Sequence, residues 1–242
     1  MPVFATTDLT AASYSVDLFA LAASSVLLVA GTGWVRRGWK IPVMLCALAT
    51  LVGVGAVYDG RMAWAAAGKV PIVYHYVGWM VSMPLQILAL YFFAGQVGRQ
   101  QSGLFWRLAV VSVLMVFVRY LGEADYMHAT LAFLIGLVFW LYILGELFFG
   151  TMDDAVSRSE HPYIRRGYFW MRLIVTIGWA IYPLGNFITS FGGYEDTGAL
   201  SVAYNLTDIL NRVAFGVAML AVAILASEPT PDAVTHKEGS RQ

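Results

Sequence analysis

Charge is scarce in this chain of 242 residues: 12% of the residues are charged, whereas 59% are hydrophobic. A soluble protein of this size needs far more charge to cover its surface, so the composition indicates a membrane protein. The net charge is zero, which gives no electrostatic signal for nucleic acid. We therefore expect a lipid bilayer around the chain and no nucleic-acid partner.

Cysteine and histidine are also scarce. The single cysteine, Cys46, excludes a disulfide framework within the chain and a cysteine-based metal site. His75 is the only histidine inside a clearly apolar span, and one histidine makes no metal site. We expect neither a metal centre nor enzymatic catalysis. The first residues lack the basic stretch of a cleavable signal peptide, so the first apolar run is expected to remain as a span.

Long apolar runs dominate the rest of the chain. Each is close to the ~20 residues that cross a bilayer, and lipid requires each to be helical. We expect an all-α integral membrane protein, a seven-transmembrane-helix bundle over residues 12–226, with an N-terminal segment (1–11) and a flexible tail (227–242) outside it. The expected spans are 12–34, 41–62, 71–93, 108–122, 127–149, 168–190 and 199–226, with polar loops at 95–107 and 150–166.

Basic residues are concentrated in the loops after the first, third and fifth spans, and by the positive-inside rule these loops are cytoplasmic. They are Arg36, Arg37, Lys40, Arg99, Arg107, Arg158, Arg165 and Arg166. The N-terminus is therefore expected outside and the tail in the cytoplasm, which suits a multi-pass protein of the cell (inner) membrane.

The last apolar run carries an acid and a base, Asp208 and Arg212, four residues apart. This spacing places both side chains on one face of a helix. Charged groups at membrane depth are costly, which makes the pair a candidate functional site.

Aromatic residues recur at helical spacing in two other spans. Tyr76 and Trp79 share a face of the third span, and Trp179, Tyr182 and Pro183 form a cluster in the sixth. Such spacing is typical of helix packing as well as of a ligand pocket, so the pattern alone leaves both interpretations open.

In combination, these motifs resemble a microbial (type 1) rhodopsin, closest to the proteorhodopsin and xanthorhodopsin branch. The segments that carry the resemblance are 76–84, 120–124, 140–147, 178–183 and 204–216. The resemblance implies a retinal pocket, or opsin-like cavity, built from Tyr76, Trp79, Ser82, Met83, Gln86, Trp179, Tyr182, Pro183 and Asn186. At Asn186 the family has an aromatic residue instead.

One departure concerns the chromophore. The family carries a lysine four residues after the seventh-helix aspartate, and that lysine forms the Schiff base with retinal. Arg212 stands at that position, with Asp208 as the matching counterion. An arginine keeps its proton up to a pH above ~12 and is not a usable nucleophile toward an aldehyde. The resemblance therefore implies no covalent retinal, although retinal could bind non-covalently.

Further departures concern proton transfer. The acid that accepts the Schiff-base proton matches Gly78, the acid that returns a proton matches Ala89, and the gating arginine matches His75. Glycine and alanine cannot titrate, so no acceptor–donor relay is expected at these positions.

Three hypotheses follow. In the first, the chain is a lysine-less rhodopsin homologue and not a light-driven proton pump. It would act as a structural or regulatory membrane protein, a trimer or pentamer or a hetero-oligomer with a true rhodopsin. In the second, it is a sensory or binding protein for non-covalent retinal or another apolar ligand. In the third, it is a retinal-based ion transporter or photoreceptor. The Asp208–Arg212 pair is either a mimic of the Schiff-base cation or a salt bridge that fixes the seventh helix.

Overall fold

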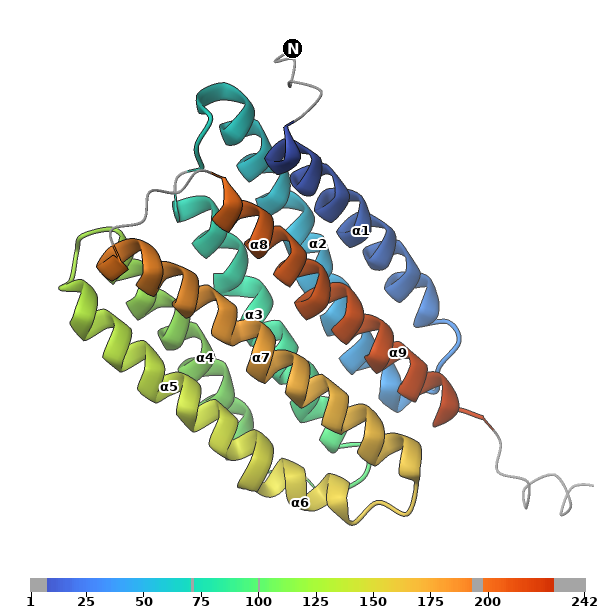
Figure 1. Cartoon of the computed structure of the whole chain (residues 1–242). Helices are drawn as coiled ribbons and strands as arrows, with labels where there is room; N and C mark the ends of the chain where they lie inside the picture. Colours follow the sequence, from blue (N-terminus) through green and yellow to red (C-terminus); the bar gives the residue numbers. More distant parts are fainter. Residues whose placement is uncertain (1–7, 71, 100, 193–197, 229–242) are drawn as a thin grey trace, which may run out of the picture.

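The computed structural model describes residues 8–70, 72–99, 101–192 and 198–228. Over these residues the chain forms a bundle of seven helical rods (Figure 1). The elements are α1 (Leu9–Gly31), α2 (Arg37–Ala67), α3 (Ile72–Ala94), α4 (Ser102–Glu123), α5 (Ala129–Phe149), α6 (Thr151–Ser157), α7 (Pro162–Gly192), α8 (Ala199–Asp208), the π-helical segment η1 (Ile209–Ala214) and α9 (Phe215–Leu225).

The predicted seven-helix fold is confirmed. Among the described residues, six segments are long and apolar enough to cross a membrane, namely α1, α2, α3, α4, α5 with α6, and α8 to α9. The seventh rod, α7, packs against α5, α8 and α9 in the same bundle. The protein is therefore a multi-pass membrane protein. Figure 1 shows α1 beginning at one end of the bundle and α9 ending at the other.

Local sequence explains where several helices begin and end. The Asp8 carboxylate caps α1 by accepting a hydrogen bond from the Ala11 amide at 2.8 Å, which satisfies one of the free N–H groups of the first turn. The helix α2 runs to Ala67 and ends at Gly68, which has a φ of 64°. Only glycine adopts this left-handed conformation at little cost, so Gly68 is a suitable stop.

Two expected loops are partly helical. The helix α4 begins at Ser102 rather than in the region of residue 108, because Leu104 and Leu108 lie one turn apart and are both fully buried. The predicted loop 150–166 contains α6 and the first turn of α7. The charged residues of this segment concealed a short amphipathic pattern, in which Met152 and Val156 face the core.

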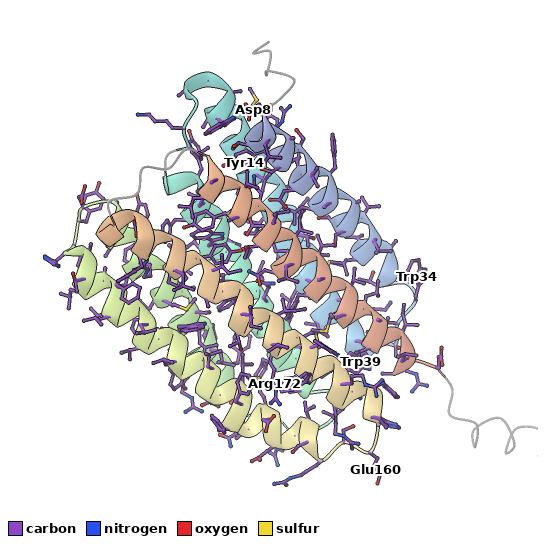
Figure 2. All side chains as sticks on the ribbon, in the orientation of Figure 1. Asp8, Tyr14, Trp34, Trp39, Glu160 and Arg172 are labelled. Carbon is purple, nitrogen blue, oxygen red and sulfur yellow. The ribbon has the colours of Figure 1, made fainter. Side chains whose placement is uncertain are left out.

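An ion pair between Arg172 and Asp153 fastens α6 to α7, and the Arg172 guanidinium also lies over the Phe148 ring at 4.5 Å. Figure 2 shows Arg172 toward the end of the bundle where α6 lies, opposite Asp8 and Tyr14. The predicted tail 227–242 falls almost wholly outside the described residues.

Candidate functional site

A cavity of about 450 Å³ lies between α3, α4, α5 and α7. Its wall is almost entirely aromatic and aliphatic. The lining residues are Tyr76, Trp79, Met83, Met115, Val116, Arg119, Phe133, Gly136, Leu137, Trp140, Trp179, Ala180, Tyr182, Pro183, Leu184 and Phe187. A mostly apolar cavity of this size suits a small apolar ligand.

Six of the nine residues assigned to the pocket from sequence line this cavity; they are Tyr76, Trp79, Met83, Trp179, Tyr182 and Pro183. Two others lie outside its lining. Ser82 accepts a hydrogen bond from Arg212, and Gln86 donates one to the Asn211 carbonyl oxygen, so their polar atoms bind the last helical rod. The side chain of Asn186 lies outside the described part of the chain.

Residues of α4 and α5 complete the wall and were not assigned from sequence. The most unexpected is Arg119, whose guanidinium lies 5.0 Å from the centre of the Phe133 ring and pairs with Glu123 at 3.4 Å. Gly136 lets this side chain pass close to α5, because a Cβ at Gly136 would lie 2.7 Å from Arg119 carbons. The methionine and aromatic residues of these helices are typical of any apolar span, so the sequence gave no sign that they line a cavity.

Asp208 and Arg212 form a buried ion pair. Asp208 is the last residue of α8, and Arg212 lies in the π-helical segment η1, which the sequence did not predict. The carboxylate of Asp208 accepts hydrogen bonds from Arg212 and from the Tyr182 hydroxyl, and Arg212 also donates to Ser82 at 3.1 Å. Local π-helix is often found at functional sites, and here it accompanies the only ion pair within the described part of this rod.

The ion pair does not open into the large cavity. Neither Asp208 nor Arg212 lines it, whereas Trp79 and Tyr182 do, with their ring centres 4.3 Å apart. The Tyr182 ring faces the cavity while its hydroxyl donates to Asp208. A ligand in the cavity is therefore one aromatic layer away from the charges.

The three positions matched to proton transfer have distinct surroundings. A Cβ at Gly78 would lie 2.7 Å from the Ala56 Cβ and 3.9 Å from an Arg212 nitrogen, so α2 occupies the space an acid would need. Ala89 is fully buried in the core. The His75 ring stacks on Trp79 at 5.6 Å and meets the Tyr204 ring edge-on at 5.5 Å.

Asp17 is the functional candidate that sequence reasoning missed. It lies in the middle of α1, its side chain is 0% exposed, and neither carboxyl oxygen has a hydrogen-bond partner. It interacts electrostatically with Asp208 and Arg212. A single acid in the first apolar run was the available signal, since every intramembrane acid is a functional suspect.

Neither of the two described lysines lines the large cavity. Lys40 lies in the first turn of α2 and Lys69 follows its end, whereas Lys237 is outside the described residues. Within the cavity wall, the described side chains therefore offer an aldehyde no primary amine.

Comparison with known proteins places these observations in a family. Residues 9–226 match the model of a family described as bacteriorhodopsin-like protein. A green-light absorbing proteorhodopsin from the gamma-proteobacterium EBAC31A08 is 32% identical over 91% of this chain and 88% of its own. A blue light-absorbing proteorhodopsin structure from Med12 is 30% identical with a TM-score of 0.76, covering 90% of this chain and all of the other. Xanthorhodopsin, a light-driven ion pump with a dual chromophore, superposes with a TM-score of 0.79 at 21% identity, covering 90% and 93%.

These comparisons correct the leading functional hypothesis. The interpretation of the chain as a structural or regulatory non-pump is wrong, because its relatives are named as light-absorbing proteorhodopsins. The error came from treating the residues at 78, 89 and 212 as decisive. The roles of those positions are expectations from the resemblance, whereas the similarity to a light-absorbing relative covers 91% of the chain.

Proposed function

Because the chain belongs to the family of bacteriorhodopsin-like proteins, we propose that it binds retinal and uses absorbed light to move ions across the membrane. The observation that carries this proposal is the aromatic cavity of about 450 Å³ between α3, α4, α5 and α7. The names of the light-absorbing relatives support a role in absorbing light, and the family of the chain makes retinal the proposed ligand.

The cavity wall suits a conjugated polyene. Trp79 and Tyr76 come from α3, and Trp179 and Tyr182 from α7, so flat rings from two helices border the same space. Such rings contact a flat ligand over a large apolar area without needing many rotamers to be fixed. The single charged group, Arg119, already interacts with Glu123 and with the Phe133 ring.

We further propose that Arg212 stands where the family carries its retinal-binding lysine, and that retinal is held here without a covalent bond. A guanidinium keeps its proton and is a poor nucleophile, so it cannot condense with an aldehyde as a deprotonated lysine does. The hydrogen bonds of Arg212 to Asp208 and Ser82 support a role as a fixed cation one aromatic layer away from the chromophore. Binding energy then comes from the apolar wall.

If light moves protons in this chain, the route uses groups other than Gly78 and Ala89, which cannot titrate. We propose that His75 is part of this route, since it borders the same small polar cavity as Asp208 and Arg212.

We also propose that the end of the bundle where α1 begins faces outward and that copies of the chain assemble into trimers or pentamers, alone or with another rhodopsin. Native mass spectrometry from nanodiscs would reject self-assembly if only monomers appear.

The test of the proposed function has two parts. All-trans retinal is first titrated into the purified protein in nanodiscs, and absorption and tryptophan fluorescence are recorded. We expect a saturable spectral change and quenching of tryptophan emission. A spectrum equal to that of free retinal in the same lipid, with no quenching, would reject retinal binding.

The second part uses liposomes that contain the loaded protein. We expect illumination to produce a change in internal pH or in membrane potential, absent without retinal and abolished by a matching ionophore. Retinal binding without any light-induced ion movement would reject the transport part of the proposal and leave a photoreceptor or binding protein.

A further inference from the structure

The proposed binding of retinal gives no role to the buried carboxyl of Asp17. The helix α1 that carries it packs against α2, α8, η1 and α9. Its side chain is 0% exposed, and neither of its oxygens meets a hydrogen-bond donor. An ionised carboxylate is very costly in such a place unless it is paired and hydrogen-bonded.

The charges around Asp17 come from the last helical rod. Asp208 and Arg212 are the two groups that interact electrostatically with it, one repelling and the other attracting a negative carboxylate. The described hydrogen bonds of Arg212 go to Asp208 and Ser82, so the guanidinium is already committed elsewhere. If Asp17 were ionised, two carboxylates would share one cation.

Among the described residues, the ion pairs found do not include Asp17. On its own helix, Tyr14 lies one turn earlier and is buried. On α2, Arg61 donates to the Ser15 hydroxyl at 3.1 Å and Asp59 is exposed. From α3, His75 stacks on Trp79 beside the small polar cavity. When Asp17 is protonated, the charges of Asp208 and Arg212 therefore cancel and the buried cluster is neutral.

We propose that Asp17 is a buried proton-binding site, which holds one proton beside the Asp208–Arg212 pair and supplies from α1 the second carboxyl that is missing at Gly78. The site deepens the proposed function and depends on it only for its link to light. With the proton bound, Asp17 is neutral and the single ion pair balances the cluster.

The position of the Arg212 guanidinium controls whether the proton stays. While Arg212 binds Asp208 and Ser82, Asp17 keeps its proton. A shift of the guanidinium toward Asp17 would stabilise the carboxylate and release the proton, because an opposite charge at close range favours the ionised form. Tyr182 links such a shift to the ligand, since its ring lines the large cavity and its hydroxyl holds Asp208.

A second, polar cavity offers the released proton a way out. It measures about 10 Å³, close to the volume that one water needs, and is lined by Tyr14, Ala56, Val57, Tyr74, His75, Trp79, Asn205, Asp208 and Arg212. Tyr14 lies one turn from Asp17 toward the start of α1, and Figure 2 shows it near that end of the bundle. The proton would leave toward the end of the bundle where α1, α3 and α8 begin.

Whether Asp17 carries a proton is measured in the dark and without retinal, so the outcome is independent of the proposed function. Infrared spectra of the protein in bilayers at neutral pH are expected to contain the carbonyl stretch of a protonated carboxyl, shifted in D₂O and lost in Asp17→Asn. The control Asp59→Asn, which changes an exposed acid of α2, should keep the band. The absence of any such band, or a band that survives in Asp17→Asn, would overturn the proposal.

A second variant guards against a folding defect in Asp17→Asn. Asp17→Glu keeps the acid and should shift the band rather than remove it, and an unshifted band assigns the proton to another group. Spectra recorded with sodium replaced by choline should be identical to those in sodium. A band that appears only after sodium is removed would show that Asp17 binds the metal ion instead and would reject the proton site.

The link to light is measured separately, by light-minus-dark infrared spectra of the retinal-loaded protein. We expect the Asp17 band to change upon illumination. A dark band with no light-induced change would sink the coupling to light and leave the proton site standing, whereas a missing dark band would sink the site whatever light does.

Discussion

The two sides of the bundle are built differently. Between α3, α4, α5 and α7 lies a large cavity with apolar walls, whereas α1, α2, α8 and η1 enclose a cluster of charges with space for about one water. Among the described residues, Trp79 alone borders both spaces, and Tyr182 connects them through its hydroxyl. The apolar cavity and the buried charges are thus separated by one layer of aromatic rings.

Small residues explain why the charged side is so closely packed. A Cβ at Gly53 would lie 3.2 Å from Arg212 side-chain atoms, and one at Gly60 would lie 3.1 Å from the Tyr14 ring. Because glycine has no Cβ at these two positions, α2 can pack closely against α1 and η1. The cavity side has open space in the corresponding layer, so a substitution that adds atoms should be tolerated there and damaging on the charged side.

Among the variants that test this difference between the two sides, Asp208→Ala is expected to lower stability the most. It leaves Arg212 buried without its carboxylate, and breaking a buried pair in this way typically costs about 3–5 kcal/mol. Thermal unfolding in lipid nanodiscs should show a strong loss of stability. The double variant Asp208→Leu with Arg212→Met removes both charges and should recover most of it. A single variant as stable as the parent would contradict the role given to the pair.

The next effect is steric. Gly78→Asp should destabilise the protein by roughly 1–3 kcal/mol, because its Cβ would lie 2.7 Å from the Ala56 Cβ and overpacking has costs of this order. Ala56→Gly in the same chain should restore much of the stability, which the same unfolding assay can measure. A Gly78→Asp variant with the same stability as the parent would show that α2 moves aside at little cost and that the charged side is not tightly packed.

On the cavity side, Ala180→Phe should fill part of the space without disturbing the charges. We expect retinal affinity to fall by about 10-fold, equivalent to ~1.4 kcal/mol, with little change in thermal stability. Val77→Phe, at a lipid-facing position that is 62% exposed, is the matched control. Equal affinities for the two variants would place retinal elsewhere.

The smallest effect concerns Asp8, where α1 begins. Hydrogen bonds from the Ala11 amide and the Trp64 indole lower the pKa of this carboxyl below its ordinary value of 3.8. A lowered pKa in the folded state means that Asp8 contributes stability above its unfolded pKa and loses it as pH falls through the folded one. Asp8→Ala should cost about 1 kcal/mol at neutral pH, as N-cap losses typically do, and the difference from the parent should shrink below pH ~4. A pH-independent difference would contradict the cap.

The sequence was sufficient for the helices and for part of the cavity, because apolar run length and helical spacing are local properties. It placed Trp79, Tyr182 and the Asp208–Arg212 pair on the correct rods. It could not show that Gln86 turns to the Asn211 carbonyl or that Arg119 reaches the cavity, since both depend on how helices are rotated against each other.

Two further features depended on packing between distant segments. The π-helical turn at residues 209–214 has no sequence signature of its own, and the burial of Asp17 follows only once α1 is set against α8 and η1. The resemblance drew attention to Gly78 as a position without an acid, whereas the buried carboxyl of Asp17 on another helix was not recognised.

The most direct measurement of the central claim is the release of retinal from the loaded protein upon denaturation, compared between the parent and Arg212→Lys. We predict that the parent binds retinal saturably and gives it back entirely as free retinol after denaturation in borohydride, which reduces the unbound aldehyde. In Arg212→Lys the same reagent should reduce the C=N bond to the lysine to a secondary amine and leave the ligand on the chain. Covalently retained retinal in the parent, or no saturable binding by either protein, would contradict the account.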